Sequence, residues 1–303
     1  AERALRSARE QNWGAVEIIT VDDASTDATV SRLSAVAAGL RNVRILINEK
    51  NSGVAISRNR IIQEAKGEFI AFFDDDDESH PERVALQLDR ITTYEKAFAA
   101  GAPVVCHAAR EQIYPDGSRR IERTMGESFH ERAPAGVAVA LRILAGAPLA
   151  NGYGSCATCS QMSRTSTYRA VGGFDPLFRR SQDTEFCVRV ARAGGHFVGI
   201  AKPLVVQTMT KTFDKSIARE MKYHLALVDK HKDIFDDERA YTFSREWIET
   251  KHSWLENNRR AFFARLLRLS VQHPVRVVQR LRTAVLFWGS NHAFRRFHRS
   301  MAD

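Results

Sequence analysis

Two runs of acidic residues directly follow apolar stretches of the sequence and are the strongest candidates for chemistry. Asp22 and Asp23 follow residues 16–21 (VEIITV), and four aspartates at 74–77 follow residues 69–73 (FIAFF). Adjacent carboxylates repel one another by around 1 kcal/mol per close pair even in water. A hard divalent cation such as Mg²⁺ or Mn²⁺ prefers oxygen ligands and would offset that repulsion, and it could also neutralise a diphosphate. The alternative is a solvated acidic run at the start of a helix, where acids are also favoured.

The apolar runs supply the strands that would bring these acids together. Residues 16–21, 43–47 and 69–73 have the pattern of buried strands, and helices are expected between them. This β-α-β-α-β order predicts a doubly wound, mostly parallel sheet, in which ligands bind outside the carboxyl ends of the strands. The strand-end position of both acid runs therefore favours the cation site. The helices are expected at about 25–38, 53–65, 81–99 and 183–193, with a further strand at 104–108.

The last third of the chain is helical and basic. We expect an α/β domain over residues 1–210 and a helical C-terminal region over 211–303. Much of the net charge of +9 lies here, where only Asp303 opposes the arginines after Asn258. Such a tail predicts an anionic partner, either a membrane surface or nucleic acid. Apolar residues among the arginines favour an interfacial amphipathic surface, although the same side chains could simply pack on the catalytic domain. The residues concerned are Trp254, Phe262, Phe263, Leu266, Leu267, Phe287, Trp288 and Phe294, with Arg259, Arg260, Arg265, Arg268, Arg276, Arg280, Arg282, Arg295, Arg296 and Arg299.

Composition sets further expectations. No run of about 18 apolar residues is present, so no membrane-spanning helix is expected, and the first residues, AERALRSARE, lack the apolar segment of a signal peptide. Cys156 and Cys159 form a C-x-x-C pair without the second pair that a structural zinc site needs, so packing residues or free thiols are expected. These features predict a protein of the reducing cytoplasm. The basic tail described above predicts peripheral contact with the inner face of the membrane.

Three segments taken together resemble glycosyltransferase family 2, whose members have the GT-A fold. They are EIITVDDASTDAT, then NSGVAISRNRIIQEAKGEFIAFFDDDDESHPERV, then GGFDPLFRRSQDTEFCVRVARAGG, in the order that the family uses. The resemblance covers about residues 1–205. It implies a Rossmann-like α/β domain, a nucleotide-sugar donor and a bound Mg²⁺ or Mn²⁺.

The resemblance also implies roles for individual residues. In the donor site, Asp23 matches the acid that contacts the nucleotide, Asp75 would face the ribose and Asp76 would bind the metal. Asp183, in SQDTEF, matches the general base. The supporting positions are Asn51, Gly53, Arg58 and Asn59 around the nucleotide, Asp74 in the donor-binding D-x-D region, and Gly172, Gly173, Phe174, Gln182 and Glu185 on the acceptor side.

Three departures from the family pattern are visible. The usual opening strand, of the type V-S-V-I-I-P, is absent, because the chain begins with what looks like the helix that follows it. Gln182 stands where the family usually has glutamate. The segment PLVVQTMTKTF, after the last strand, lacks the histidine that supplies a further metal ligand in many members.

The chemistry expected from this set is an inverting transfer of a sugar from a nucleotide diphosphate, with UDP as the guess, to a hydroxyl of a glycan or lipid-linked acceptor in polysaccharide or cell-envelope biosynthesis. One base opposite the leaving group suits a single displacement, and Asp183 would take the proton of the hydroxyl. Its alternative role is a surface acid at a helix start. Two competing functions are a nucleotidyltransferase that makes nucleotide sugars, and a non-enzymatic, basic nucleic-acid-binding protein. No nucleic-acid-binding signature is present, so no nucleic-acid partner is expected.

Overall fold

The computed structural model describes residues 1–210, 217–286 and 297, and these form two compact units. Unit 1 consists of Ala1–Gln112, Ile121–Ala140 and Leu149–Thr208. Unit 2 consists of Ile113–Arg120, Leu141–Pro148 and Met209–Asp303. The functional division near residue 210 stays a prediction.

Unit 1 begins with a small parallel sheet and its helices. Strands β1 (Ile18–Asp22) and β2 (Val43–Ile47) pair in parallel, with Asp22 opposite Ile47. β1 is therefore shifted from the predicted 16–21, so that Asp22 is its last residue. Leu5, Ile18 and Leu33 form the core of this part. The helices are α1 (Glu2–Arg9), α2 (Thr29–Ala37) and α3 (Val54–Glu64), which confirms the predicted alternation of strands and helices.

The remaining strands form a second sheet, in the order β3-β7-β5-β8-β4 with β6 paired to β5. Here the expectation of a mostly parallel sheet is wrong: β3 pairs with β7, β7 with β5, and β4 with β8, all antiparallel. Among the described residues, β1 and β2 are not hydrogen bonded to this sheet. The strands are β3 (Phe69–Ala71), β4 (Glu78–Ser79), β5 (Val104–Ile113), β6 (Arg119–Glu122), β7 (Gln161–Arg164) and β8 (His196–Thr208).

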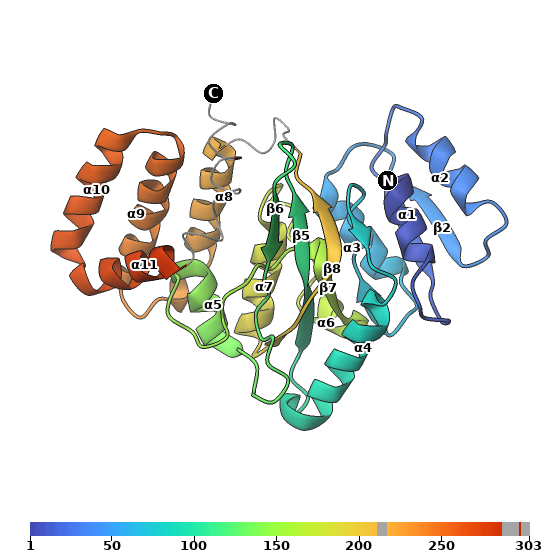
Figure 1. Ribbon diagram of the computed structural model, residues 1–303, viewed down its shortest axis with the longest axis horizontal. Helices are drawn as coiled ribbons and strands as arrows, with labels where there is room; N and C mark the ends of the chain where they lie inside the picture. Colours follow the sequence, from blue (N-terminus) through green and yellow to red (C-terminus); the bar gives the residue numbers. More distant parts are fainter. Residues whose placement is uncertain (211–216, 287–296, 298–303) are drawn as a thin grey trace. The chain divides into compact units, whose positions relative to one another are not determined.

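Helix α4 (Arg83–Tyr94) packs on β7 and β8 and ends in a π-helical turn, Glu95–Ala99 (Figure 1). Ile91 and Tyr94 of this helix join apolar residues of β5 and β8 in the main core of the unit. β5 is longer than predicted because nearly all of its side chains are buried. The other helices are α5 (Gly136–Ala145), α6 (Thr165–Ala170), α7 (Gln182–Arg192) and the short 3₁₀ turn Thr158–Ser160.

Most of unit 2 is a stack of helices in which consecutive members are neighbours (Figure 1). They are α8 (Ile217–Lys230), the 3₁₀ turn Lys232–Ile234, α9 (Glu238–Leu255), α10 (Arg259–Gln272) and α11 (Pro274–Leu286). Within the ranges described, no helix has the length and apolar character needed to cross a bilayer. Phe287, Trp288, Phe294, Arg295, Arg296 and Arg299 lie outside the described residues.

Candidate active site

Asp23 follows β1 and holds the turn that precedes α3. Its carboxylate accepts hydrogen bonds from Asn48 Nδ2 at 2.8 Å and from the backbone N–H groups of Ser52 and Gly53 at 3.0 and 2.7 Å. Partial burial alone would raise the pKa of Asp23, but these hydrogen bonds outweigh it and lower the pKa. Asp23 is thus ionised at neutral pH and fixes the segment that contains Asn51, which is itself exposed.

Helix α3 carries two side chains that join this region to the acid loop and to the segment before α7. Arg58 Nη2 lies 2.6 Å from Asp74 Oδ1, and the guanidinium lies 5.5 Å from the ring centre of Phe174. The residue is buried, and its Nη1 has no hydrogen-bond partner among the described residues. The next residue, Asn59, pairs with the backbone of Phe174 through both ends of its amide, at 2.8 and 2.7 Å.

The acid loop divides into exposed and buried carboxylates. Asp75 and Asp76 are exposed, Asp74 is half-buried beside Arg58, and Asp77 is only 4% exposed. Asp77 Oδ1 accepts a long hydrogen bond from the N–H of Thr208, and Asp77 Oδ2 is buried with no partner in the described part of the chain. Burial raises the pKa of Asp77 to about 7, and the charges of Asp74 and Asp76 add to the shift.

Asp74, Asp77 and the thiol of Cys159 form a cluster that could in principle hold a metal, since their ligand atoms lie within 4.8 Å of one another. The predicted ligand, Asp76, is not in this cluster. Burial raises the pKa of the Cys159 thiol, so the thiol stays protonated and is a poor ligand for a hard cation. The oxygen atoms of the exposed acids fit Mg²⁺ or Mn²⁺ better, and a cation there would relieve the repulsion felt by Asp77.

Behind the acid loop, Arg83 of α4 is completely buried. Its guanidinium donates to the carbonyl of Phe72 at 2.9 Å, to Ser79 Oγ at 2.8 Å and to Gln87 Oε1 at 2.9 Å. Arg83 therefore ties the end of β3 to the start of α4 and fixes both ends of the loop. Sequence reasoning missed this residue. The signal was the spacing of polar residues at 83, 87 and 90 on the helix face that also carries Ile91 and Tyr94.

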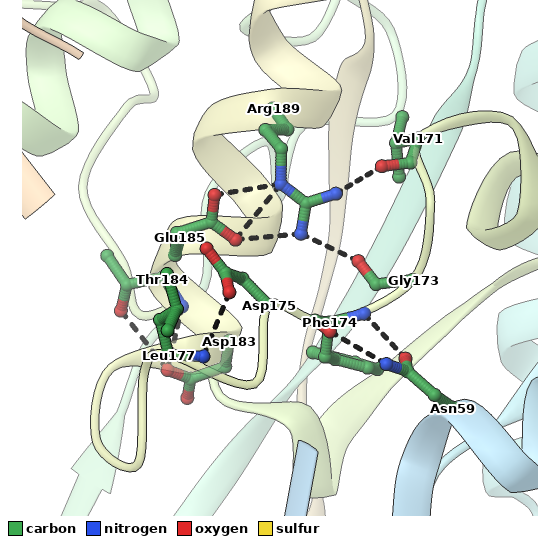
Figure 2. A network of polar contacts seen from close by, with 10 residues as sticks. All are labelled: Asn59, Val171, Gly173, Phe174, Asp175, Leu177, Asp183, Thr184, Glu185 and Arg189. Atoms are coloured by element: carbon green, nitrogen blue, oxygen red, sulfur yellow. Dashed lines mark hydrogen bonds and ion pairs between the residues drawn. The ribbon is translucent and has the colours of Figure 1, made fainter. Parts of the chain in front are cut away.

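In the segment before α7, Gly173 and Phe174 are packed rather than open (Figure 2). Phe174 is 1% exposed and lies against the rings of Phe72 and Phe186, with centroids 5.5 and 5.0 Å apart. Gly173 has a φ of +68°, and a Cβ at this position would lie 2.4 Å from Asn59 Oδ1. Both residues were expected on the acceptor side, but the structure uses them to support the loop.

Glu185 and Arg189 hold the same segment from α7, as the close-up shows (Figure 2). The Glu185 carboxylate is fully buried and lies 2.7 Å from Arg189 Nη2. Arg189 also donates to the carbonyl of Gly173 at 2.6 Å and to that of Val171. Glu185, expected to face an acceptor, therefore positions the loop because its carboxylate is committed to Arg189.

Asp183 lies in the first turn of α7 and is half-buried, as is Gln182 beside it. Its Oδ1 accepts hydrogen bonds from the N–H of Thr184 at 2.7 Å and from Thr184 Oγ1 at 3.2 Å, whereas Oδ2 accepts none among the described residues. One turn along, the Cys187 thiol accepts from Gln161 Nε2 at 3.6 Å, and the Gln161 carbonyl accepts from Phe72 N–H at 3.1 Å. Through Gln161, the middle of α7 is thereby connected to Phe72, the residue that follows β3.

The structure links several of the predicted site residues through direct contacts. Asp23 fixes the turn before α3, Arg58 reaches Asp74, and Asn59 holds Phe174. Within this frame the side chains of Asp75 and Asp76 are exposed, and Oδ2 of Asp183 is uncommitted. Side chains of these types can bind a cation that holds a diphosphate, and can accept a proton. That they share one catalytic site stays a prediction.

Comparison with known proteins finds glycosyltransferases. Residues 1–139 match the family model of Glycosyl transferase family 2. The amylovoran biosynthesis glycosyltransferase AmsB of Erwinia amylovora is 28% identical over 240 residues, which cover 77% of this chain and 74% of AmsB. Other matches are partial: those to YibD of Escherichia coli and TuaG of Bacillus subtilis cover 22% and 39% of those proteins.

Two solved structures share the fold. The crystal structure of S. aureus TarS 1–349 in complex with UDP has a TM-score of 0.57 at 16% identity, covering 99% of this chain and 85% of that one. The mannosyltransferase PcManGT of Pyrobaculum calidifontis, in complex with GDP-Man and Mn²⁺, has a TM-score of 0.53 at 16% identity, covering 99% and 81%. The expected α/β fold of GT-A type is therefore confirmed. The chain is a glycosyltransferase that contains a match to glycosyltransferase family 2 over residues 1–139.

Proposed function

We propose that this glycosyltransferase moves a sugar from a UDP-linked donor to a hydroxyl of a glycan or lipid-linked acceptor, with inversion at the anomeric carbon. The observation that carries the proposal is the acid loop: Arg58 neutralises Asp74, while the Asp75 and Asp76 side chains are exposed beside it. AmsB is named for biosynthesis of amylovoran, and TarS was solved with UDP, which supports a nucleotide donor and a glycan product.

Asp23, Asn51, Gly53 and Arg58 would bind the nucleotide. Asp23 has a lowered pKa and keeps a negative charge that suits ribose or base donors. Arg58 has one buried guanidinium nitrogen without a partner, and a donor phosphate would satisfy it at little cost in reorganisation.

Asp76, together with Asp74, would hold a divalent cation. A bound Mg²⁺ or Mn²⁺ would stabilise the charge that develops on the diphosphate leaving group. PcManGT was solved with Mn²⁺, which favours that class of ion for the family fold. Asp77, buried beside a protonated thiol, would support the loop rather than bind the ion.

Asp183 would accept the proton of the acceptor hydroxyl. Its Oδ1 is held by Thr184, which orients the carboxylate, and Oδ2 is left to take the proton. Gln182 would flank the acceptor. The packed loop of Gly173 and Phe174 would keep Asp183 in place, because it connects α3 to α7.

The deciding experiment compares Asp183→Asn with Asp27→Asn. Asp27 is an exposed acid at the start of α2, and it accepts a hydrogen bond from Thr29 N–H at 2.9 Å, so it matches Asp183 in local chemistry. We expect Asp183→Asn to lower kcat by about 10²–10⁴-fold with unchanged donor affinity. Asp27→Asn should leave kcat intact. Equal, small effects of the two changes would rule out Asp183 as the base.

Calorimetry of nucleotide binding tests the donor and the ion. A panel of UDP, GDP, dTDP and CMP is titrated with and without Mn²⁺, and UDP should bind with a metal-dependent gain. Asp76→Asn should remove that gain, while Asp77→Asn should preserve it in the folded protein. The reverse result would assign the ion to the buried cluster with Cys159.

A further inference from the structure

Helix α10 exposes a line of large apolar side chains. Phe263, Leu267 and Val271 are 60%, 69% and 77% exposed, and their spacing of four residues places them on one side of the helix. The next helix, α11, also exposes large apolar side chains, since Val275 and Val278 are 68% and 64% exposed. We call these five residues the apolar stripe.

The stripe is additional to the apolar face that holds the helices together. Leu269 of α10 and Val277 of α11 are buried with Phe243 of α9, and Leu266 packs against them. A helix in a bundle needs one apolar face toward its neighbours. A second, exposed face of large side chains marks a surface that meets something else.

The charges around the stripe indicate what that partner is. α10 and α11 contain no acidic residue. Some of their arginines are used within unit 2: Arg265 and Arg268 pair with Glu249 and Glu246 of α9, and Arg280 lies over the ring of Trp247.

Three other arginines, Arg260, Arg276 and Arg282, make no hydrogen bond or ion pair within the described ranges, and Arg260 and Arg282 are exposed. Arg260 lies one turn before the stripe on the same side of α10, and Arg282 lies one turn after Val278 on α11. On each of the two helices, the exposed apolar side chains are therefore flanked by a positive charge that nothing in the described chain neutralises.

We propose that the apolar stripe, with Arg260 and Arg282, docks on an anionic lipid surface. Apolar side chains that enter the headgroup boundary beside unpaired arginines are the features that give interfacial helices their affinity for such surfaces. A second copy of the chain fits less well, because a symmetric contact would bring arginines against arginines. The proposal concerns binding alone and does not depend on the transfer reaction.

Vesicle flotation tests the proposal with the whole chain. Vesicles contain phosphatidylcholine alone or with phosphatidylserine, and binding should need the anionic lipid. Arg260→Gln with Arg282→Gln should weaken binding by about 25-fold, since each arginine near such a surface contributes about 5-fold. The matched control is Arg41→Gln with Arg239→Gln. It removes the same charge from two exposed positions, Arg41 before β2 and Arg239 on α9, and should change vesicle binding less than about twofold.

A second variant, Phe263→Ser with Leu267→Ser, tests the apolar part. It should also lose binding while its circular dichroism melting curve stays unchanged, because both side chains are largely exposed. An equal loss of vesicle binding in the control variant, Arg41→Gln with Arg239→Gln, would overturn the proposal. So would equal binding to phosphatidylcholine, binding to duplex nucleic acid in place of vesicles, or a dimer in light scattering that the serine variant dissociates.

Discussion

Replacing Gly173 by alanine tests whether the loop before α7 is held in the way the structure indicates. The left-handed backbone at φ +68° costs alanine about 1–2 kcal/mol. The new Cβ would lie 2.4 Å from Asn59 Oδ1, which accepts the hydrogen bond from Phe174 N–H. If Asn59 withdraws, that buried amide loses its partner, at about 1–3 kcal/mol more. The free energy of unfolding should therefore fall by about 2–5 kcal/mol.

Gly172 provides a matched control one residue earlier. Its φ is +79°, yet no atom lies within 4 Å of the position that a Cβ would take. Gly172→Ala should then lower the free energy of unfolding by only about 1–2 kcal/mol, which is what the left-handed backbone costs alanine. Urea unfolding of both variants, followed by circular dichroism, measures the difference. If the two variants lose the same stability, the contact between Gly173 and Asn59 does not constrain the loop, and the assignment of Gly173 to its support is wrong.

Three further outcomes follow from buried groups. Glu185→Ala should lower the free energy of unfolding by about 3 kcal/mol, because it leaves the charge of Arg189 uncompensated. Glu185→Gln should recover part of that free energy in urea titrations. If Glu185→Ala lost no stability, the role of the Glu185–Arg189 pair would be contradicted. The pKa of Asp23 is lowered from its ordinary value of 3.8. The stability that its ionised carboxylate adds to the fold is therefore complete above that pH and is lost as pH falls through the lowered pKa. Asp23→Asn should therefore reduce the free energy of unfolding at pH 7 and make it fall less steeply as the pH is lowered. If the free energy of unfolding of the variant and of the unchanged protein fell in parallel in acid, this reasoning would be refuted. All four cysteines are free and buried, and burial raises the pKa of Cys106 to about 12, so a thiol reagent at pH 8 should label the protein only after unfolding; rapid labelling of the folded chain would contradict the burial.

The first half of the catalytic fold could be predicted from local patterns. Each apolar run that ends in an acid marks a strand and its carboxyl end, and this information lies within a few neighbouring residues. The contact between Arg58 and Asp74 was not predicted, although α3 and β3 are close in sequence.

The rest depends on partners far along the chain. β7 has the polar sequence QMSR, with no apolar run to reveal it, and it forms through antiparallel pairing with β3 and β5. Arg90 is buried because the carbonyls of Gly126 and Gly199 receive its guanidinium. Glu185 looked like a free acid near a site because Arg189, one turn later, only becomes its partner once α7 forms. Buried charges of this kind are visible only when both partners are placed.

The buried guanidinium of Arg83 has a consequence for how a donor is recognised. Because it fixes the backbone on both sides of the acid loop, little conformational freedom remains there for a ligand to remove. Association should then be fast and should show a small loss of entropy from the loop. Changes of donor preference would have to come from the outward side chains at 75 and 76, while the loop that carries them keeps one shape.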